Sequence, residues 1–129
     1  MAAAKGADLI VNALPLAFGP NVLEAALEAK TNYQDFAATD ALLDSWVDGI
    51  KLMYTEYGKR FAEIGKMAII GTGSAPGFIC VAARNAMRYL DSCDTIYNIV
   101  YEGVEAQRFL PFWWSPITAL SDMSEDDYA

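Results

Sequence analysis

The stretch Met67-Ala-Ile-Ile-Gly-Thr-Gly-Ser-Ala-Pro-Gly77 places four apolar residues directly before a turn that contains three glycines. An apolar segment with helical periodicity follows, from Phe78 to Leu90. A strand, a glycine-rich turn and a helix form an arrangement that α/β proteins use to hold a nucleotide or a small substrate. Glycines let the backbone approach a ligand closely, and a helix N-terminus offers unpaired N–H groups. We therefore expect a ligand-binding turn at Gly71–Gly77, with a tight connection that binds no ligand as the alternative.

Two further strand-and-helix units precede this one. Asp8–Leu14 is a nearly continuous apolar run that stops at Pro15, which predicts a strand covered on both faces, as in a parallel sheet. Good helix formers fill Asn21–Ala29, with a proline near the first turn. Thr31–Ala37 is the expected second strand.

A long helical stretch is expected to begin at Thr39-Asp40 and to end at Gly65-Lys66, and Asp48-Gly49 could interrupt it. Its apolar residues recur three or four positions apart, which predicts one buried stripe rather than a cofactor site. They are Trp46, Ile50, Met53, Tyr54, Tyr57, Phe61 and Ile64. The repeated strand–helix units predict an α/β fold with a parallel sheet and right-handed crossovers.

The character of the chain changes after Leu90. Thr95–Tyr101 alternates and carries β-branched and aromatic residues, which predicts a strand with one wetter face. Ser115-Pro116 is typical of a helix start, because serine caps the helix and proline suits its first position. We therefore expect one domain over residues 1–93 and the beginning of another over residues 94–129.

Composition limits the classes of function. The chain has 129 residues, of which 54% are hydrophobic, enough for one domain with a core. Its net charge of −8 argues against non-specific binding to nucleic acid or to an anionic membrane. The sequence shows no signal peptide and no apolar stretch near the roughly 18 residues that span a bilayer, so we expect a cytoplasmic protein.

The two cysteines do not suggest a metal site or a nucleophile. Cys80 and Cys93 have no zinc-like spacing, and the absence of histidine from the sequence excludes a Cys–His pair within it. Cys80 falls in the apolar segment after the glycine-rich turn and is expected to be a small core residue.

Four segments, taken in order, carry a resemblance to a known family. Ala7–Pro15 is similar to a fourth Rossmann strand with its terminal Asn-x-x-Pro, and Ala25–Asp35 to the motif A-A-x-E-A-G-x-x-Y-x-D. Gly71–Gly77 is similar to G-x-G-x-D-P-G, and Phe112–Pro116 to a W-S-P segment at the start of a substrate domain. Together they resemble the saccharopine dehydrogenase-like NAD(P)-dependent oxidoreductases. The chain departs from the family pattern at Lys30, where glycine is usual, and at Ala75, where aspartate is usual.

The resemblance implies the second half of a Rossmann-type parallel sheet, followed by the start of an α+β substrate domain. It also implies an internal fragment without the Gly-x-Gly-x-x-Gly turn that holds the pyrophosphate. We therefore expect weak or absent NAD(P) binding by the isolated chain. The strand at Asp8–Leu14 would be an open edge that pairs with a second copy or with a partner chain.

Ligands of doubly wound sheets lie outside the C-terminal strand ends. There the resemblance implies cofactor contacts by Asn12, Leu14, Pro15, Gly71, Gly73, Pro76 and Gly77, and substrate contacts by Asp35, Ser74, Trp114 and Ser115. Each group has a structural alternative. Asn12–Pro15 could be a strand end at a turn-forming proline, Asp35 a helix cap or solvated carboxylate, and Trp114 part of a domain interface. No catalytic residue is assigned.

The function implied by the resemblance is hydride transfer between NAD(P) and a secondary amine or imine derived from an amino acid. The chain alone would be inactive. One alternative is a non-enzymatic binding or assembly module that dimerises through the open sheet edge. Another is a split enzyme whose N-terminal half is a separate polypeptide.

Overall fold

The computed structural model describes residues 4–37 and 46–99, together with residues 101, 103, 105, 107 and 108. The chain divides into two compact units, Met1–Asp94 and Thr95–Ala129. The assignment of these parts to a cofactor domain and a substrate domain stays a prediction. In the described ranges, no helix is long and apolar enough to cross a membrane.

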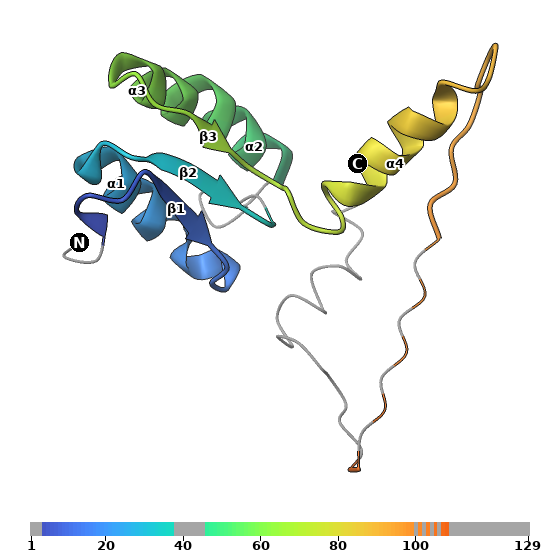
Figure 1. Ribbon diagram of the computed structural model, residues 1–129, viewed down its shortest axis with the longest axis horizontal. Coiled ribbons are helices and arrows are strands. Elements are labelled where there is room, and N and C mark those ends of the chain that lie inside the picture. The colour runs from blue at the N-terminus through green and yellow to red at the C-terminus, as the bar shows by residue number, and fades with distance from the viewer. Residues whose placement is uncertain are drawn as a thin grey trace. The chain divides into compact units, whose positions relative to one another are not determined.

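Three parallel strands form an open sheet in the order β1-β2-β3 (Figure 1). They are β1, Leu9–Asn12, β2, Asn32–Asp35, and β3, Ala68–Ile69. The register pairs Ile10 with Tyr33 and Tyr33 with Ala68, so these three residues form one row across the sheet. The sheet alternates with helices, which confirms the predicted α/β class and makes the fold Rossmann-like.

The described helices lie within segments that the sequence predicts to be helical, with small differences at their ends, except for the short η2, which it does not predict. They are η2, Leu16–Phe18, α1, Gly19–Ala29, α2, Trp46–Leu52, η3, Met53–Tyr57, α3, Gly58–Glu63, and α4, Phe78–Met87. The predicted interruption at Asp48-Gly49 is wrong, because α2 runs through both residues. The predicted helix start at Thr39-Asp40 lies outside the described residues.

Helix α1 ends in a left-handed turn centred on Lys30, whose φ is 53°. Its N–H donates to the Leu27 carbonyl oxygen, and the N–H of Thr31 donates to that of Ala26, both at 3.1 Å. This pair of bonds defines a Schellman motif, in which glycine is the usual left-handed residue. Helix α3 ends with the same pair of bonds at Gly65, as the sequence predicts. The fold thus explains why glycine suits position 30.

Thr31, the next residue, is fully buried. Its hydroxyl has no hydrogen-bond partner among the described groups. A buried hydroxyl without a partner loses its hydration and gains no hydrogen bond in exchange, so burial of this group is unfavourable.

The core lies on one face of the sheet, between β2 and the helices. Its buried residues are Leu23, Ala26, Leu27, Tyr33, Met53 and Phe61. Both crossovers step across the sheet in the same direction, and right-handed connections of that kind put their helices on the same face. The rings of Tyr33 and Phe61 meet with centroids 6.4 Å apart, which ties the central strand to α3.

On the other face of the sheet, the apolar side chains of the described edge strands are exposed. Leu9 and Val11 of β1, with Met67 and Ile69 at β3, have exposed fractions between 46% and 62%. The expectation that the first strand is covered on both faces is therefore wrong for the described residues. The cause is topological, because both sets of helices between the strands pack on the opposite face.

An ion pair on the surface links α1 to α3. The Arg60 guanidinium donates to both carboxylate oxygens of Glu24 at 2.6 Å, and the Tyr57 hydroxyl donates to the same carboxylate at 3.1 Å. Arg60 also lies 5.1 Å from the centre of the Tyr57 ring. Hydrogen bonds from Arg60 hold the pKa of Glu24 below its ordinary value.

The predicted buried stripe is correct in part. Met53 and Phe61 are buried, and Ile50, Tyr57 and Ile64 are half-buried, but Tyr54 is exposed. Tyr54 is 73% exposed although it adjoins Met53 in the π-helical turn η3, so the buried face there is narrower than the predicted stripe. The side chain of Trp46 lies outside the description.

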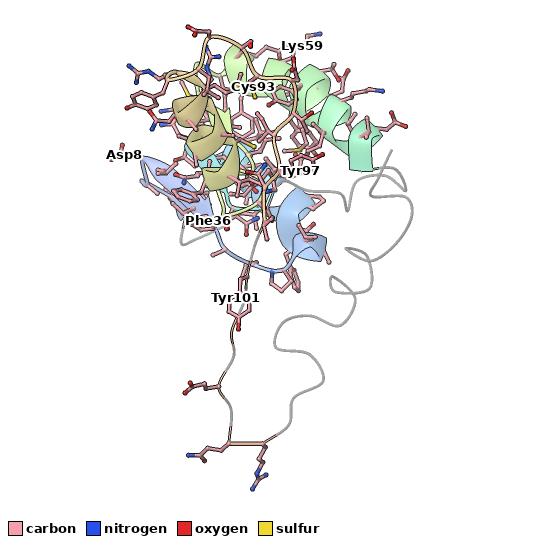
Figure 2. The ribbon with its side chains drawn as sticks, turned by 90° about the vertical axis from the view of Figure 1, so that its right-hand side faces the viewer. Asp8, Phe36, Lys59, Cys93, Tyr97 and Tyr101 are labelled. Carbon is pink, nitrogen blue, oxygen red and sulfur yellow. The ribbon has the colours of Figure 1, made fainter. Side chains whose placement is uncertain are left out.

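Two expectations for the later part of the chain are wrong. Cys80 is exposed rather than in the core, because α4 contributes no buried residue. The described residues of Thr95–Tyr101 form no strand, and no partner strand pairs with them. Tyr101, labelled in Figure 2, has a side chain that is 92% exposed.

Candidate functional site

The carboxylate of Asp35 joins the end of β2 to the glycine-rich turn after β3. Asp35 is only 4% exposed, and its Oδ1 accepts a 2.7 Å hydrogen bond from the N–H of Gly71. Its carbonyl oxygen accepts two more from Thr72, at 3.0 Å from the N–H and 2.6 Å from the hydroxyl. Asp35 is therefore neither a helix cap nor a solvated carboxylate. It anchors the turn.

The end of β1 joins the same network through Tyr33. The amide Nδ2 of Asn12 donates to the Tyr33 hydroxyl at 3.0 Å, and that hydroxyl donates to Oδ2 of Asp35 at 3.0 Å. The Oδ1 of Asn12 accepts the N–H of Leu14 at 3.1 Å. Burial raises the pKa of Tyr33, and the neighbouring Asp35 raises it further, so the phenol keeps its proton.

A pocket of about 230 Å³ lies at the C-terminal ends of β1 and β2. It is lined by Asn12, Ala13, Leu14, Leu16, Gly19, Asp35, Phe36 and Ala37. Sites for drug-sized ligands hold about 300–1,000 Å³, so this pocket admits a single ring or a small amine rather than a dinucleotide. The pocket brings together predicted residues from the ends of two strands.

The glycines of the turn allow backbone to approach backbone. A Cβ at Gly73 would overlap the carbonyl oxygen of Phe36, and one at Gly77 would overlap that of Gly73. Gly77 also has a φ of 126°, which L-residues rarely adopt. Packing within the chain therefore accounts for both glycines without a ligand.

The start of α4 is not the open anion site that the sequence suggests. The N–H groups of Phe78 and Ile79 donate to the carbonyl oxygens of the turn at 2.8 and 3.1 Å. Those of Cys80 and Val81 both donate to Gly77, at 3.1 and 3.2 Å. The expectation of unpaired N–H groups is therefore wrong. The turn folds back over the helix start and uses its donors.

The remaining predicted residues lie in different places. Leu14 is exposed and lines the pocket. Pro15 directly precedes η2, and its carbonyl oxygen accepts a hydrogen bond from the N–H of Phe18. Ser74 is exposed, and Pro76 follows it in the turn after a cis peptide bond. Trp114 and Ser115 lie outside the described residues.

The sequence did not single out Tyr33 as a link between strand ends. A signal was present, because residues two apart on a strand share a face and Tyr33 therefore accompanies Asp35. Across the described part of the chain, no three cysteine, aspartate or glutamate side chains gather as a metal site requires.

One comparison with known proteins gives a match. The chain is 33% identical over 95 residues to carboxynorspermidine synthase from Vibrio alginolyticus. The matched region is 69% of this chain and 22% of the relative, so the chain spans about a fifth of that protein's length. No family model and no solved structure matches the chain. The chain has distant, partial similarity to a saccharopine dehydrogenase-like enzyme.

Proposed function

We propose that the chain is part of an NAD(P)-dependent oxidoreductase that acts on a secondary amine or imine derived from an amino acid. The observation that carries the proposal is the pocket at the C-terminal ends of β1 and β2, where α/β sheets bind their ligands. The similarity to carboxynorspermidine synthase supports the same class of reaction.

The residues of the pocket fit the reactive end of such a cofactor. When bound, reduced nicotinamide supplies a hydride to the carbon of a C=N bond, while a proton from solvent completes the amine. Leu14 and Phe36 would flank the ring and exclude water, since both are exposed apolar side chains at the pocket. Asn12 would hold the turn that carries Leu14, and Asp35, next to Phe36, would hold the glycine-rich turn after β3 against the end of β2.

The pocket does not fit a whole dinucleotide. Its volume is too small, and the paired N–H groups at the start of α4 leave no donors there for phosphate. We therefore propose that the chain alone binds NADPH and NADH weakly or not at all.

The test is a titration of the isotope-labelled chain with nicotinamide mononucleotide, NADPH and NADH, followed by NMR. The mononucleotide should shift the resonances of Leu14 and Phe36, and Ala37→Trp should abolish the shifts because it fills the pocket. The matched control Ala82→Trp changes an exposed residue of α4 and should leave them intact. If the mononucleotide leaves Leu14 and Phe36 unmoved, the pocket is not the site. Micromolar affinity for NADPH would contradict the proposed weak binding.

A second candidate function is assembly through β1. We propose that this edge strand pairs with a strand of a second copy of the chain, because Leu9 and Val11 are exposed and β1 contains no charge or proline. Light scattering should then show oligomers that Val11→Lys dissociates. Ile69→Lys is the control, since Ile69 has the same 50% exposure at the opposite edge strand. A stable, monodisperse wild-type monomer would contradict this proposal.

A further inference from the structure

The hydroxyl of Tyr33 lies between two pocket-lining side chains, Asn12 and Asp35, that each hold a turn at the C-terminal ends of the strands. The tyrosine is 1% exposed, and its ring packs in the core against Phe61. On one side the hydroxyl accepts from Asn12, and on the other it donates to Asp35, both at 3.0 Å. A core residue thus contacts both strand ends at once.

Each of those two side chains also binds a backbone N–H group. Asn12 accepts from the N–H of Leu14, at the turn after β1, and Asp35 accepts from the N–H of Gly71, at the turn after β3. A continuous chain of hydrogen bonds therefore runs from Leu14 through the Tyr33 hydroxyl to Gly71. It crosses all three strand ends.

The donors and acceptors of this chain are compatible with one arrangement. An ionised carboxylate can only accept, so the Tyr33 proton points to Asp35 and the phenol oxygen is left to accept from Asn12. The Asn12 amide must then present its Nδ2 to Tyr33 and its Oδ1 to the Leu14 N–H. A flipped amide would place two donors against each other at Leu14. The raised pKa of Tyr33 keeps the proton that this arrangement needs.

We propose that Tyr33 is a positioning residue: it fixes the turn at Ala13–Leu14 and the glycine-rich turn relative to each other, and it holds the pocket-lining side chains of Asn12 and Asp35 in place. The inference rests on the proposed function only for what enters the pocket. Tyr33 touches no reacting atom in this scheme. It acts through Asn12 and Asp35.

The test is a set of three variants of the full chain, read by the amide resonances and hydrogen exchange of Leu14 and Gly71. Tyr33→Phe keeps the ring in the core but breaks the chain at its centre, so both resonances should move. Exchange at each amide should become about five- to tenfold faster, because each side of the chain loses one of the two hydrogen bonds that the hydroxyl makes. Asn12→Ala should move Leu14 and leave Gly71 near its wild-type position, because the bond between Tyr33 and Asp35 remains.

Phe61→Leu is the control for simple loss of core packing. It should lower the free energy of unfolding while both amide resonances stay in place, because it removes no member of the hydrogen-bond chain. The proposal is overturned if Tyr33→Phe leaves the Leu14 and Gly71 resonances unchanged. It is also overturned if Asn12→Ala and Phe61→Leu move both resonances as Tyr33→Phe does.

A titration with nicotinamide mononucleotide separates this inference from the proposed function. If the wild-type pocket binds the mononucleotide, Tyr33→Phe should weaken binding at least about five- to tenfold, the effect of one of the two hydrogen bonds that the variant removes. An unchanged affinity in that variant would overturn the positioning role. If the wild-type chain does not bind the mononucleotide, the proposed function is overturned but the positioning role of Tyr33 is not, because the amide measurements need no ligand.

Discussion

Replacing Lys30 with glycine should stabilise the protein. Lys30 has a φ of 53° at the end of α1, where its Schellman motif places a left-handed residue. Gly65 occupies the same position at the end of α3 with a φ of 65°. The same left-handed turn is therefore formed by lysine at the end of α1 and by glycine at the end of α3. Only Lys30 has a Cβ, which is sterically unfavourable in this conformation.

The size of the effect follows from two opposing terms. An L-residue in the left-handed region costs about 1–2 kcal/mol. Replacement by glycine removes this cost, but part of the gain in stability is lost because glycine stabilises the unfolded chain by about 0.5–1 kcal/mol. Lys30→Gly should therefore be more stable than Lys30→Ala by about 0.5–1 kcal/mol. In a unit of this size that corresponds to a rise in Tm of about 2–8 °C.

Urea and thermal unfolding of the two variants measure this difference directly, and the comparison cancels the loss of the lysine charge. Gly65→Ala is the matched opposite change and should lose a similar amount. A Cβ at that position would meet nothing within 4 Å, so its cost is conformational alone. The reasoning fails if Lys30→Gly is no more stable than Lys30→Ala, or if Gly65→Ala costs nothing.

Three further predictions concern packing and charge. Gly73→Ala should lose more than about 2 kcal/mol in urea unfolding, because its methyl group overlaps backbone. Gly58→Ala is the control, because a Cβ at this helical position makes only an ordinary contact; it should gain up to about 1 kcal/mol. If Gly73→Ala and Gly58→Ala changed the stability equally, the packing argument would be wrong. Thr31→Val should gain about 1 kcal/mol in the same assay by removing a buried hydroxyl without a described partner, whereas a loss would point to an unseen partner. Glu24→Gln should cost less than about 1 kcal/mol at pH 7, since the pair with Arg60 is half-exposed. Because the folded-state pKa of Glu24 is lowered, this cost should hold above its ordinary pKa of 4.5 and vanish as the pH falls through the lowered value. Unfolding over a series of pH values from 7 into the acid range checks it, and a cost that does not diminish with falling pH would exclude the ion pair as its source.

The strands and helices could be predicted because their signals are local. The apolar run at β1 and the helix formers of α1 specify these elements without knowledge of what packs on them. How many faces of the sheet are covered could not be predicted in this way. Leu9 and Val11 are as apolar as their neighbour Ile10, yet they face solvent. Both crossovers place their helices on the opposite face of the sheet, where Ile10 lies.

The candidate site shows the same division. The convergence of Asn12, Asp35 and Gly71 follows from parallel topology alone, which carries equivalent strand ends to one edge. What their polar groups bind depends on rotamers and on the path of the turn. The sequence therefore could not reveal that the Asp35 carboxylate binds the chain itself, nor that the glycine-rich turn uses the donors at the start of α4.

The exposed apolar side chains of the edge strands have a consequence for the heat capacity of unfolding. That quantity is normally about 12–15 cal/mol/K per residue, because unfolding hydrates apolar surface that the native state had kept dry. In this protein Leu9, Val11, Met67 and Ile69 are already exposed to water before unfolding begins, as are Phe78 and Val81 of α4. Calorimetry of the isolated chain should therefore find a smaller increment per residue. Its stability should change less steeply on cooling than that of a fully layered domain of equal length.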